Sequence, residues 1–513
     1  MLSTVKSIKL NGTEPAVITV EVDITSGIGI HLVGLADMAV KESLLRTVTA
    51  LQSKGFHIPG KKVVINLAPA DLNKSGSGYD LAIALSVISA SGQHALPNLQ
   101  DWLVLGELGL DASVRGVPGA LQAILATRSN GLRGCIVPQA NINEFAELIR
   151  DEVPVYAAGS LDDAINIIEK TEDTPTAWDW YCMQGKPAVC DPSIDYWSHL
   201  KGQDGAKRAL EIAAAGAHPL LLMGAPGSGK STVAKTLVDL LPPLTKEESI
   251  EIAKIYSASG HQTDVRRRPF RAPHYSASKV AIFGGGGGCG ENIQPGEVSL
   301  AHNGVFFLDE ACECPKPLQE TLRVPLEDKQ VVISRLKNKV TYPAHFHFVA
   351  AMNPCPCGYY GEGSRCTCTP GQRYSYQKAL SGPILDRLTL MVWLHPLSKE
   401  AIEKAQEGEP LSAVAERVRK ARERQAARYK GTAYRTNEDV QSKDADKYFS
   451  ISEEQKELID KLFTHTGISV RSYFPILKLA RTIADLSGDK DILSCHLAEA
   501  IGYRFLDRIQ REE

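Results

Sequence analysis

The sequence predicts an α/β protein with an N-terminal α/β or α+β domain, a doubly wound sheet as its core and a helical C-terminal subdomain. Short apolar runs alternate with helical patterns over residues 1–168. An apolar strand, a glycine-rich turn and a helical pattern then follow one another at 220–241. After Pro396 the patterns are helical. At 513 residues the chain is too long for a single hydrophobic core.

The N-terminal domain is expected to occupy residues 1–168. Its strand-like runs are Ala16–Val22, Val63–Leu67, Leu103–Leu105 and Gly134–Val137, and its helical patterns include Ala39–Gln52 and Gly119–Ser129. Residues 169–197 show no sustained period and contain several prolines and acidic side chains, which is typical of a linker or a strap.

The core is expected to span residues 198–396 and the helical subdomain residues 397–513. In the core, a helix over Gln203–Gly216 precedes strands at Leu220–Met223, Val305–Leu308 and Phe346–Ala351. The later helical patterns cover Leu411–Tyr429, Glu453–Thr464, Val470–Ser487 and Ser494–Arg508. The polar stretch Lys430–Lys447 between them is predicted to be a flexible loop.

Composition limits the classes of function. The formal net charge of -3 excludes a globally basic nucleic-acid coat, so contact with DNA or RNA would come from local patches. The start, MLSTVKSIKL, lacks the apolar core of a signal peptide, and no stretch reaches the roughly 18 apolar residues of a membrane span. We therefore expect a cytoplasmic protein without membrane contact.

The glycine-rich turn matches the G-x4-G-K-[ST] pattern of a P-loop. It follows an apolar strand and precedes a helical pattern, which is the context that the motif requires. Its backbone N–H groups would wrap the phosphates of ATP, Lys230 would bridge the β and γ phosphates, and Ser231 would bind Mg2+. The residues expected to bind the nucleotide are Gly224, Ala225, Pro226, Gly227, Ser228, Gly229, Lys230, Ser231, Thr232 and Asp309.

Two later strands end in polar side chains that suit the same site. Val305–Leu308 is followed by Asp309, expected to hold Mg2+, and Glu310, expected to polarise the attacking water. Phe346–Met352 is followed by Asn353, whose amide can orient that water. Arg387 and Arg471 come after these motifs along the chain. An arginine supplied by a neighbouring subunit can stabilise the charge that develops on the γ-phosphate, and the order of the motifs makes these two arginines the candidates.

Several long strings carry a resemblance to a known family. They are GQDGAKRAL at 202–210, RPFRAPH at 268–274, PGEVSLAH at 295–302, NPCPCG at 353–358 and ARTIADL at 480–486. With these strings and the P-loop, the whole chain resembles the ComM/YifB group of magnesium-chelatase-like AAA+ ATPases. The resemblance implies that Asn353 is sensor 1, Arg387 the arginine finger and Arg471 sensor 2. It also implies a homo-hexameric ring with ATP sites between subunits and, for ComM members, ATP-driven branch migration of DNA.

The N-terminal domain contains the strings GLADMAVKE at 34–42 and NLAPAD at 66–71. With them it resembles the Lon protease catalytic domain, of the ribosomal S5 domain 2-like fold, which raises the alternative of a Ser-Lys peptidase. The corresponding loop reads KSGSGYD at 74–80, where the nucleophile position falls on Gly78 with Ser75 and Ser77 nearby. The lysine position falls in Gly116–Leu121, which contains no lysine. Because a serine without a base is not activated at neutral pH, we interpret residues 1–168 as a non-proteolytic ring or DNA-guiding module.

Four cysteines lie within the loop 355–368, directly after the strand that ends at Asn353. Cys355, Cys357, Cys366 and Cys368 form a C-x-C-x8-C-x-C pattern. Four thiolates suit tetrahedral Zn2+, although the spacing within each pair is tighter than usual. Reduced free thiols or a redox pair are the alternatives.

Candidate contacts with DNA are local. Val331–Val340 is predicted to be a β-hairpin, and resemblance to related ring motors implies that Arg335, Lys337 and Lys339 contact DNA phosphates. Arg266–Arg268 with Arg271 form a second candidate patch, and residues 417–430 carry seven basic side chains and one acidic one. For the latter helix a solvated face is the alternative.

We therefore weigh three functions. The first is a DNA motor, in which ATP hydrolysis drives branch migration or helicase-type remodelling of single-stranded or branched DNA in recombination or natural transformation. The second is a chelatase-like ATPase that remodels a protein partner. The third is a peptidase fused to an ATPase, which the absent lysine disfavours.

Overall fold

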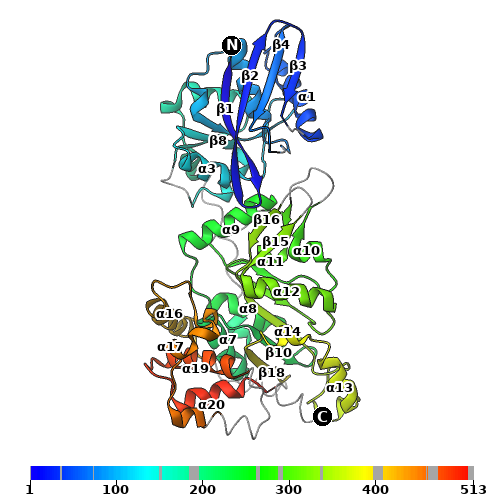
Figure 1. Ribbon diagram of the computed structural model, residues 1–513, viewed down its shortest axis with the longest axis vertical. Helices are drawn as coiled ribbons and strands as arrows, with labels where there is room; N and C mark the ends of the chain where they lie inside the picture. Colours follow the sequence, from blue (N-terminus) through cyan, green and yellow to red (C-terminus); the bar gives the residue numbers. More distant parts are fainter. Residues whose placement is uncertain are drawn as a thin grey trace.

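The computed structural model describes residues 2–34, 37–72, 74, 76–148, 153–183, 196–261, 266–286, 293–334, 339–396, 408–457, 459 and 472–505. These residues form three parts (Figure 1). An N-terminal α/β part occupies one end of the long axis, a core with a parallel sheet extends from the middle to the other end, and the C-terminal helices lie beside the core at that end.

The N-terminal part is built on a seven-stranded mixed sheet. Its order is β3 (Gly29–Val33), β4 (Lys62–Ala68), β2 (Glu14–Thr25), β1 (Ser3–Asn11), β5 (Trp102–Val104), β8 (Gly134–Pro138) and β9 (Val155–Ala158). Helices α1 (Met38–Ser53), α2 (Asp80–Ser91), α3 (Ala120–Ser129) and α4 (Leu161–Glu169) accompany it. The predicted strands and helices of residues 1–168 are confirmed, and β1 and β2 form a long antiparallel hairpin.

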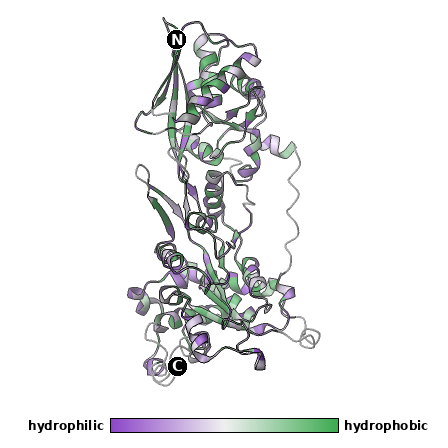
Figure 2. Cartoon of the chain, turned by 90° about the vertical axis from the view of Figure 1, so that its right-hand side faces the viewer, coloured by the Kyte–Doolittle hydropathy of each residue, from purple (hydrophilic) through white to green (hydrophobic). Residues whose placement is uncertain are grey.

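The core sheet has five strands, all parallel. Its order is β11 (Phe270–Arg271), β14 (Val305–Leu308), β17 (His347–Met352), β10 (Leu220–Gly224) and β18 (Leu390–Leu394). The helices around it include α7 (Asp204–Gly216), α8 (Lys230–Leu240), α9 (Lys246–Ser259) and α12 (Lys316–Asp328). Burial of β10 and β14 along their whole length accounts for their continuous apolar sequences. Figure 2 shows these hydrophobic strands inside the molecule.

The C-terminal part is helical, as predicted. Its described long helices are α16 (Leu411–Arg428), α19 (Tyr473–Ser487) and α20 (Ser494–Gly502). Helices α16 and α19 both pack against α7 of the core, so the apolar faces of the three helices share one hydrophobic core.

The prediction that Lys430–Lys447 is a flexible loop is wrong. The segment contains the short helices η5 (Asn437–Asp439), η6 (Ser442–Asp444) and α17 (Ala445–Tyr448). Asn437 is fully buried, and its side-chain amide donates to Thr482 Oγ1 at 2.9 Å and Asp485 Oδ2 at 3.0 Å on α19. Polar composition was misleading here because these side chains are buried with hydrogen-bond partners.

The expected linker at 169–197 is also partly structured. Helix α5 (Ala177–Met183) packs against the N-terminal part, with Tyr181 buried and its hydroxyl 2.9 Å from Glu147 Oε1. Residues 184–195 lie outside the described part of the chain. The sequence hid this helix because α5 is only seven residues long, too short to display a clear helical period.

The N-terminal part and the core share a packed junction. Helix α3 lies against α9, where Gln122 Nε2 donates to Lys254 O at 2.7 Å and the Gly119 N–H donates to Ser257 O at 3.1 Å. At the tip of the β1–β2 hairpin, a Cβ atom on Gly12 would lie 2.5 Å from Val340 Cγ1. The backbones of the two parts are therefore in direct contact. Among the described residues, no helix has the length and apolar character needed to cross a membrane.

Candidate nucleotide site, cysteine cluster and hairpin

The P-loop connects the buried strand β10 to the start of α8. Gly227 and Gly229 have φ angles of 80° and 90°, a left-handed conformation that favours glycine, and α8 begins at the next residue. At Gly224, a Cβ atom would lie 2.5 Å from the carbonyl oxygen of Leu394. The glycines therefore allow a turn whose backbone N–H groups and helix N-terminus suit the phosphates of a nucleotide.

Lys230 lies over this turn and reaches a second strand. Its ammonium donates to Gly224 O at 2.8 Å, Ala225 O at 3.0 Å and Asn353 Oδ1 at 3.1 Å. Asn353 follows β17, which neighbours β10 in the sheet. Burial lowers the pKa of Lys230, and the carboxylates of Asp309 and Glu310 oppose that shift. The structure thus brings Lys230 and Asn353 together at one edge of the sheet.

The acidic pair lies at the same edge, at the end of β14. Asp309 Oδ2 lies 3.4 Å from Ser231 Oγ, and Asp309 Oδ1 accepts the Glu310 N–H at 2.9 Å. A hydroxyl and a carboxylate oxygen are ligands that suit Mg2+, so Ser231 and Asp309 fit that ion. Glu310 is exposed and has a φ of 50°, a left-handed conformation that is uncommon for a non-glycine residue.

Arg387 lies at the opposite edge of the sheet. It precedes β18, which pairs Leu390 with Leu220 and Leu394 with Gly224. The start of β18, which follows Arg387, therefore lies at the opposite end of the strands from the P-loop, with the length of β10, about 13 Å, between them. The Arg387 guanidinium forms an ion pair with Glu327 and donates to Pro383 O. Arg387 and Lys230 of one chain are not brought together.

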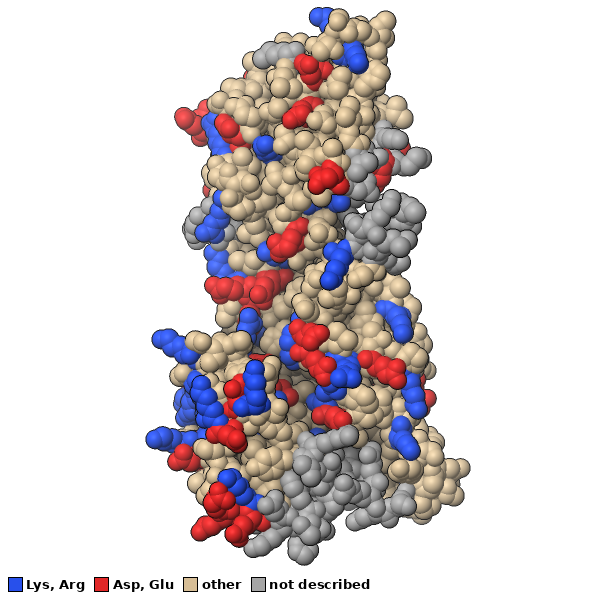
Figure 3. Space-filling view, in the orientation of Figure 1, with Lys and Arg blue, Asp and Glu red and all other residues tan. Residues whose placement is uncertain are grey.

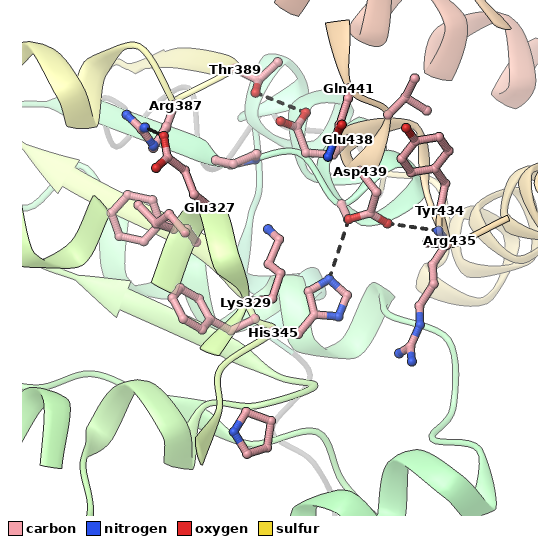
Figure 4. A pocket seen from close by; sticks show the side chains of 18 of the residues that line it. Glu327, Lys329, His345, Arg387, Thr389, Tyr434, Arg435, Glu438, Asp439 and Gln441 are labelled. Carbon is pink, nitrogen blue, oxygen red and sulfur yellow. Dashed lines mark hydrogen bonds and ion pairs between the residues drawn. The ribbon is translucent and has the colours of Figure 1, made fainter. Parts of the chain in front are cut away.

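Arg387 opens on a groove between the core and the C-terminal part (Figure 4). The groove has a volume of about 1180 Å³ and carries both signs of charge. Glu438 accepts from Thr389 at 3.2 Å, and His345 Nε2 lies 3.9 Å from Asp439 on the far wall. These polar contacts connect the two walls of the groove, which are the amino ends of the core strands and the segment Thr436–Gln441.

The predicted β-hairpin is present. Strand β15 (Gln330–Ser334) pairs antiparallel with β16 (Lys339–Pro343), and Ser334 lies opposite Lys339. Lys339 is exposed, whereas Arg335 and Lys337 fall outside the described residues, as does Arg471. At the base of the hairpin, Tyr342 is buried and its hydroxyl donates to Ile293 O at 2.6 Å.

In the two other basic regions predicted as possible DNA contacts, several arginines form ion pairs within the protein. Arg268 pairs with Glu248 at 2.8 Å, and Arg271 forms a bidentate pair with Glu297. In α16, Arg417 pairs with Glu409 and Glu211, and Arg428 pairs with Asp485. The face shown in Figure 3 accordingly has basic and acidic side chains interspersed. These pairs favour the hairpin over either of the other two regions as a nucleic-acid contact.

The four cysteines of residues 355–368 converge. All four Sγ atoms lie within 4.8 Å of one another, with Cys355–Cys366 at 3.8 Å and Cys357–Cys366 at 3.7 Å. A tetrahedral zinc site with Zn–S bonds of about 2.3 Å requires Sγ atoms about 3.8 Å apart. The donor set and its spacing therefore fit Zn2+.

Lys74 and Ser77 of the N-terminal loop each contact another residue. Lys74 is fully buried and donates to the carbonyl oxygen of Pro69, and burial lowers its pKa. The Ser77 hydroxyl donates to Glu107. Ser75 falls outside the described residues. The contacts of Lys74 and Ser77 thus do not pair these two residues as a base and a nucleophile.

Gln319 links two segments of the core by hydrogen bonds, and the sequence alone does not indicate this. It is fully buried in α12, where its amide donates to Cys314 O at 2.8 Å and accepts the Ser381 N–H at 2.7 Å. Gln319 thereby joins the segment after Glu310 to the segment that leads to Arg387. A glutamine within a helix resembles a solvated residue in sequence, so no local signal marks it.

This arrangement is that of a P-loop ATPase with an AAA-like core. Three family models agree: "Magnesium chelatase, subunit ChlI" matches residues 196–402, "Subunit ChlI of Mg-chelatase" matches 20–141, and "Magnesium chelatase, subunit ChlI C-terminal" matches 408–504. The chain belongs to the magnesium-chelatase ChlI-like family of ATPases, in the group that contains ComM and YifB.

Full-length relatives support this assignment. A protein named YifB from Escherichia coli is 40% identical over 523 residues, which cover 99% of this chain and 98% of the relative. Competence protein ComM from Haemophilus influenzae is 39% identical over 503 residues, which cover 97% and 96% respectively. YifB from Salmonella typhimurium is 39% identical over 506 residues, with coverage of 97% and 96%.

Proposed function

We propose that this protein is a subunit of an ATP-driven ring motor that remodels DNA, through branch migration or helicase-type movement in recombination or natural transformation. The proposal rests on one observation: the residues expected to act in ATP hydrolysis lie at both ends of the strands of the core sheet. Lys230, Ser231, Asp309, Glu310 and Asn353 lie at one edge, and Arg387 lies at the other.

Each residue at the carboxyl edge has a part in hydrolysis. Lys230 contacts the β and γ phosphates, while Ser231 and Asp309 hold Mg2+, which neutralises phosphate charge when bound. Glu310 accepts the proton of the attacking water, and Asn353 orients that water. The contact between Lys230 and Asn353 supports these assignments because it places both side chains at the same point.

The position of Arg387 supports a ring. Arg387 precedes β18 at the amino ends of the strands, whereas the P-loop follows β10 at their carboxyl ends, so Arg387 is placed to serve the γ-phosphate of a neighbouring subunit rather than that of its own chain. Head-to-tail contacts of this kind close into a ring when the rotation between subunits closes. We infer a homo-hexamer, with Arg387 released from Glu327 as the neighbouring nucleotide engages it. In the same ring, Arg471 contacts the nucleotide as sensor 2.

Two observations support DNA as the substrate. One relative carries the name competence protein, and Lys339, the first residue of β16, is exposed. Arg335 and Lys337 precede it in the sequence. The N-terminal part packs against strand β16 of this hairpin at Val340–Tyr342, a position that suits a module guiding the DNA. We propose that this part is Lon-like in fold and non-proteolytic.

A second candidate function is remodelling of a protein partner. It is favoured by the family models, which are named for a subunit of magnesium chelatase. The two functions differ in what stimulates ATP turnover.

The deciding experiment is ATP hydrolysis with and without DNA. We expect a severalfold rise in kcat with single-stranded or branched DNA, measured by phosphate release at fixed protein concentration. The same assay with the Glu310→Gln variant controls for a contaminating ATPase. Unchanged turnover with every DNA, together with stimulation by a protein partner, would favour the second function.

The hairpin makes a separate prediction about salt. Each lysine that contacts a phosphate contributes about 0.7 to 0.9 to the slope of log affinity against log salt concentration. We expect the Lys337→Ala/Lys339→Ala pair to flatten the slope by at least about 1, measured by fluorescence anisotropy. A matched control is Lys443→Ala/Lys490→Ala, which removes two exposed lysines elsewhere. An equal slope for both pairs would place the DNA on another surface.

A further inference from the structure

The cysteine cluster lies against the P-loop. The loop that contains the cluster places Gly358 so close to Pro226 that a Cβ atom on the glycine would lie 2.7 Å from Pro226 Cδ and 2.9 Å from Cγ. The same atom would lie 4.0 Å from Cγ of Asn353. Gly358, one position beyond Cys357, therefore packs against the turn that wraps the phosphates and lies near the amide at the tip of β17.

The loop between Asn353 and Thr369 contains little regular secondary structure. Between Asn353 and Thr369 the described elements are limited to one short helix, η4 (Gly363–Arg365), and backbone bonds such as Gly358 N–H to Cys355 O at 2.9 Å. A tetrahedral metal would join the Cys355–Cys357 end, next to Asn353, to the Cys366–Cys368 end, where α13 (Pro370–Gln377) begins. Closing this loop reduces the number of conformations open to it.

Neighbouring contacts hold the loop over the carboxyl edge of the sheet. A Cβ atom on Gly361 would lie 3.1 Å from the ring of Trp393, and Tyr360 meets the same ring edge-on with centroids 6.1 Å apart. Trp393 lies on β18, directly before Leu394, whose carbonyl oxygen approaches Gly224 at the start of the P-loop. The loop thus contacts the P-loop region at Pro226 and, through Trp393, close to Gly224.

We propose that the four-cysteine site is a metal clamp on the P-loop, so that Zn2+ and nucleotide each strengthen binding of the other through the contact of Gly358 with Pro226. A bound metal keeps Gly358 against Pro226 and thereby keeps the turn in the conformation that wraps phosphates. By thermodynamic reciprocity, nucleotide must then raise zinc affinity by the same factor as zinc raises nucleotide affinity. This inference rests on the proposed nucleotide site and on zinc as the metal of the cluster.

The test measures zinc affinity rather than turnover. Full-length protein is titrated with a chromophoric chelator, with and without Mg-ADP. We expect one zinc per chain and an apparent zinc affinity that rises about 5-fold or more with nucleotide, which is within the usual range of coupling between two sites. Because ADP itself binds zinc weakly, the Lys230→Ala variant at the same ADP concentration supplies the correction.

Two glycines of the loop give a matched pair of variants. Gly358→Ala adds a methyl group against Pro226, whereas at Gly363 nothing lies within 4 Å, and both residues have a positive φ, 83° and 62°. We expect both variants to bind one zinc. The effect of nucleotide on zinc affinity should be lost in Gly358→Ala and retained in Gly363→Ala. Pro226→Ala, which leaves the metal loop untouched, should also weaken the effect when compared at an Mg-ADP concentration that saturates the variant, because Pro226 is itself one of the expected nucleotide-binding residues.

Different results would contradict the coupling, the zinc site and the nucleotide site. Equal coupling in Gly358→Ala and the wild type, or zinc affinity in the wild type that nucleotide does not change, would overturn the clamp. Less than half a zinc per chain in protein purified without chelator would remove the metal site. Failure of the wild type to bind ADP would instead overturn the proposed nucleotide site.

Discussion

Replacing Glu310 with Gln should lower kcat for ATP hydrolysis by about 10²- to 10³-fold while nucleotide affinity stays near that of the wild type. The amide keeps the size of the carboxylate but cannot accept the proton of the attacking water. Glu310 is exposed at the end of β14 and makes no direct bond to the P-loop, so the change should leave phosphate binding intact. In energy, this loss is about 2.7 to 4 kcal/mol of transition-state stabilisation.

The measurement combines steady-state phosphate release with equilibrium binding of a fluorescent nucleotide. Glu313→Gln is the matched control, because it makes the same chemical change at an exposed position three residues further along and should retain wild-type turnover. If Glu310→Gln instead weakened nucleotide binding and left kcat unchanged, Glu310 would be a binding residue and not the base.

Mixing two inactive variants should restore activity. Lys230→Ala removes the phosphate contact, and Arg387→Ala removes the arginine and should lower turnover by about 10³-fold or more. These residues lie at opposite edges of the sheet, so each active site takes them from different subunits. Random assembly then joins an intact P-loop to an intact arginine at roughly one interface in four. We expect the 1:1 mixture to approach that fraction of wild-type turnover.

The control for this experiment mixes Lys230→Ala with Glu310→Gln. Both residues belong to the same edge of one chain, so no arrangement of these two variants completes a site, and the mixture should remain inactive. If the Lys230→Ala and Arg387→Ala mixture were also no more active than its components, Arg387 would not act across a subunit interface.

The local parts of the site could be predicted from the sequence. The P-loop is a strand, a turn and a helix in immediate succession, and the acidic pair directly follows an apolar run, so short-range patterns suffice for both. The hairpin at 330–343 was predictable for the same reason. The role assigned to each residue stays a prediction, and for Arg471 so does its placement.

Contacts between distant segments could not be predicted in the same way. The 3.1 Å contact of Lys230 with Asn353 depends on β17 lying beside β10, although 123 positions separate the two residues. The packing of Asn437 beneath α19 depends on hydrogen-bond partners that composition does not show. The approach of Gly358 to Pro226 has no sequence signal beyond the glycine itself.

The junction between the N-terminal part and the core has a practical consequence for dissecting the protein. Ala253 of α9 is buried in the hydrophobic cluster of the N-terminal part, and Val340 of the hairpin lies under the tip at Gly12. A fragment that starts at the core would bring this apolar surface into water, next to the unpaired edges of a two-stranded hairpin. Such a truncated ATPase should be prone to aggregation, so its behaviour would be a poor guide to the catalytic power of the intact chain.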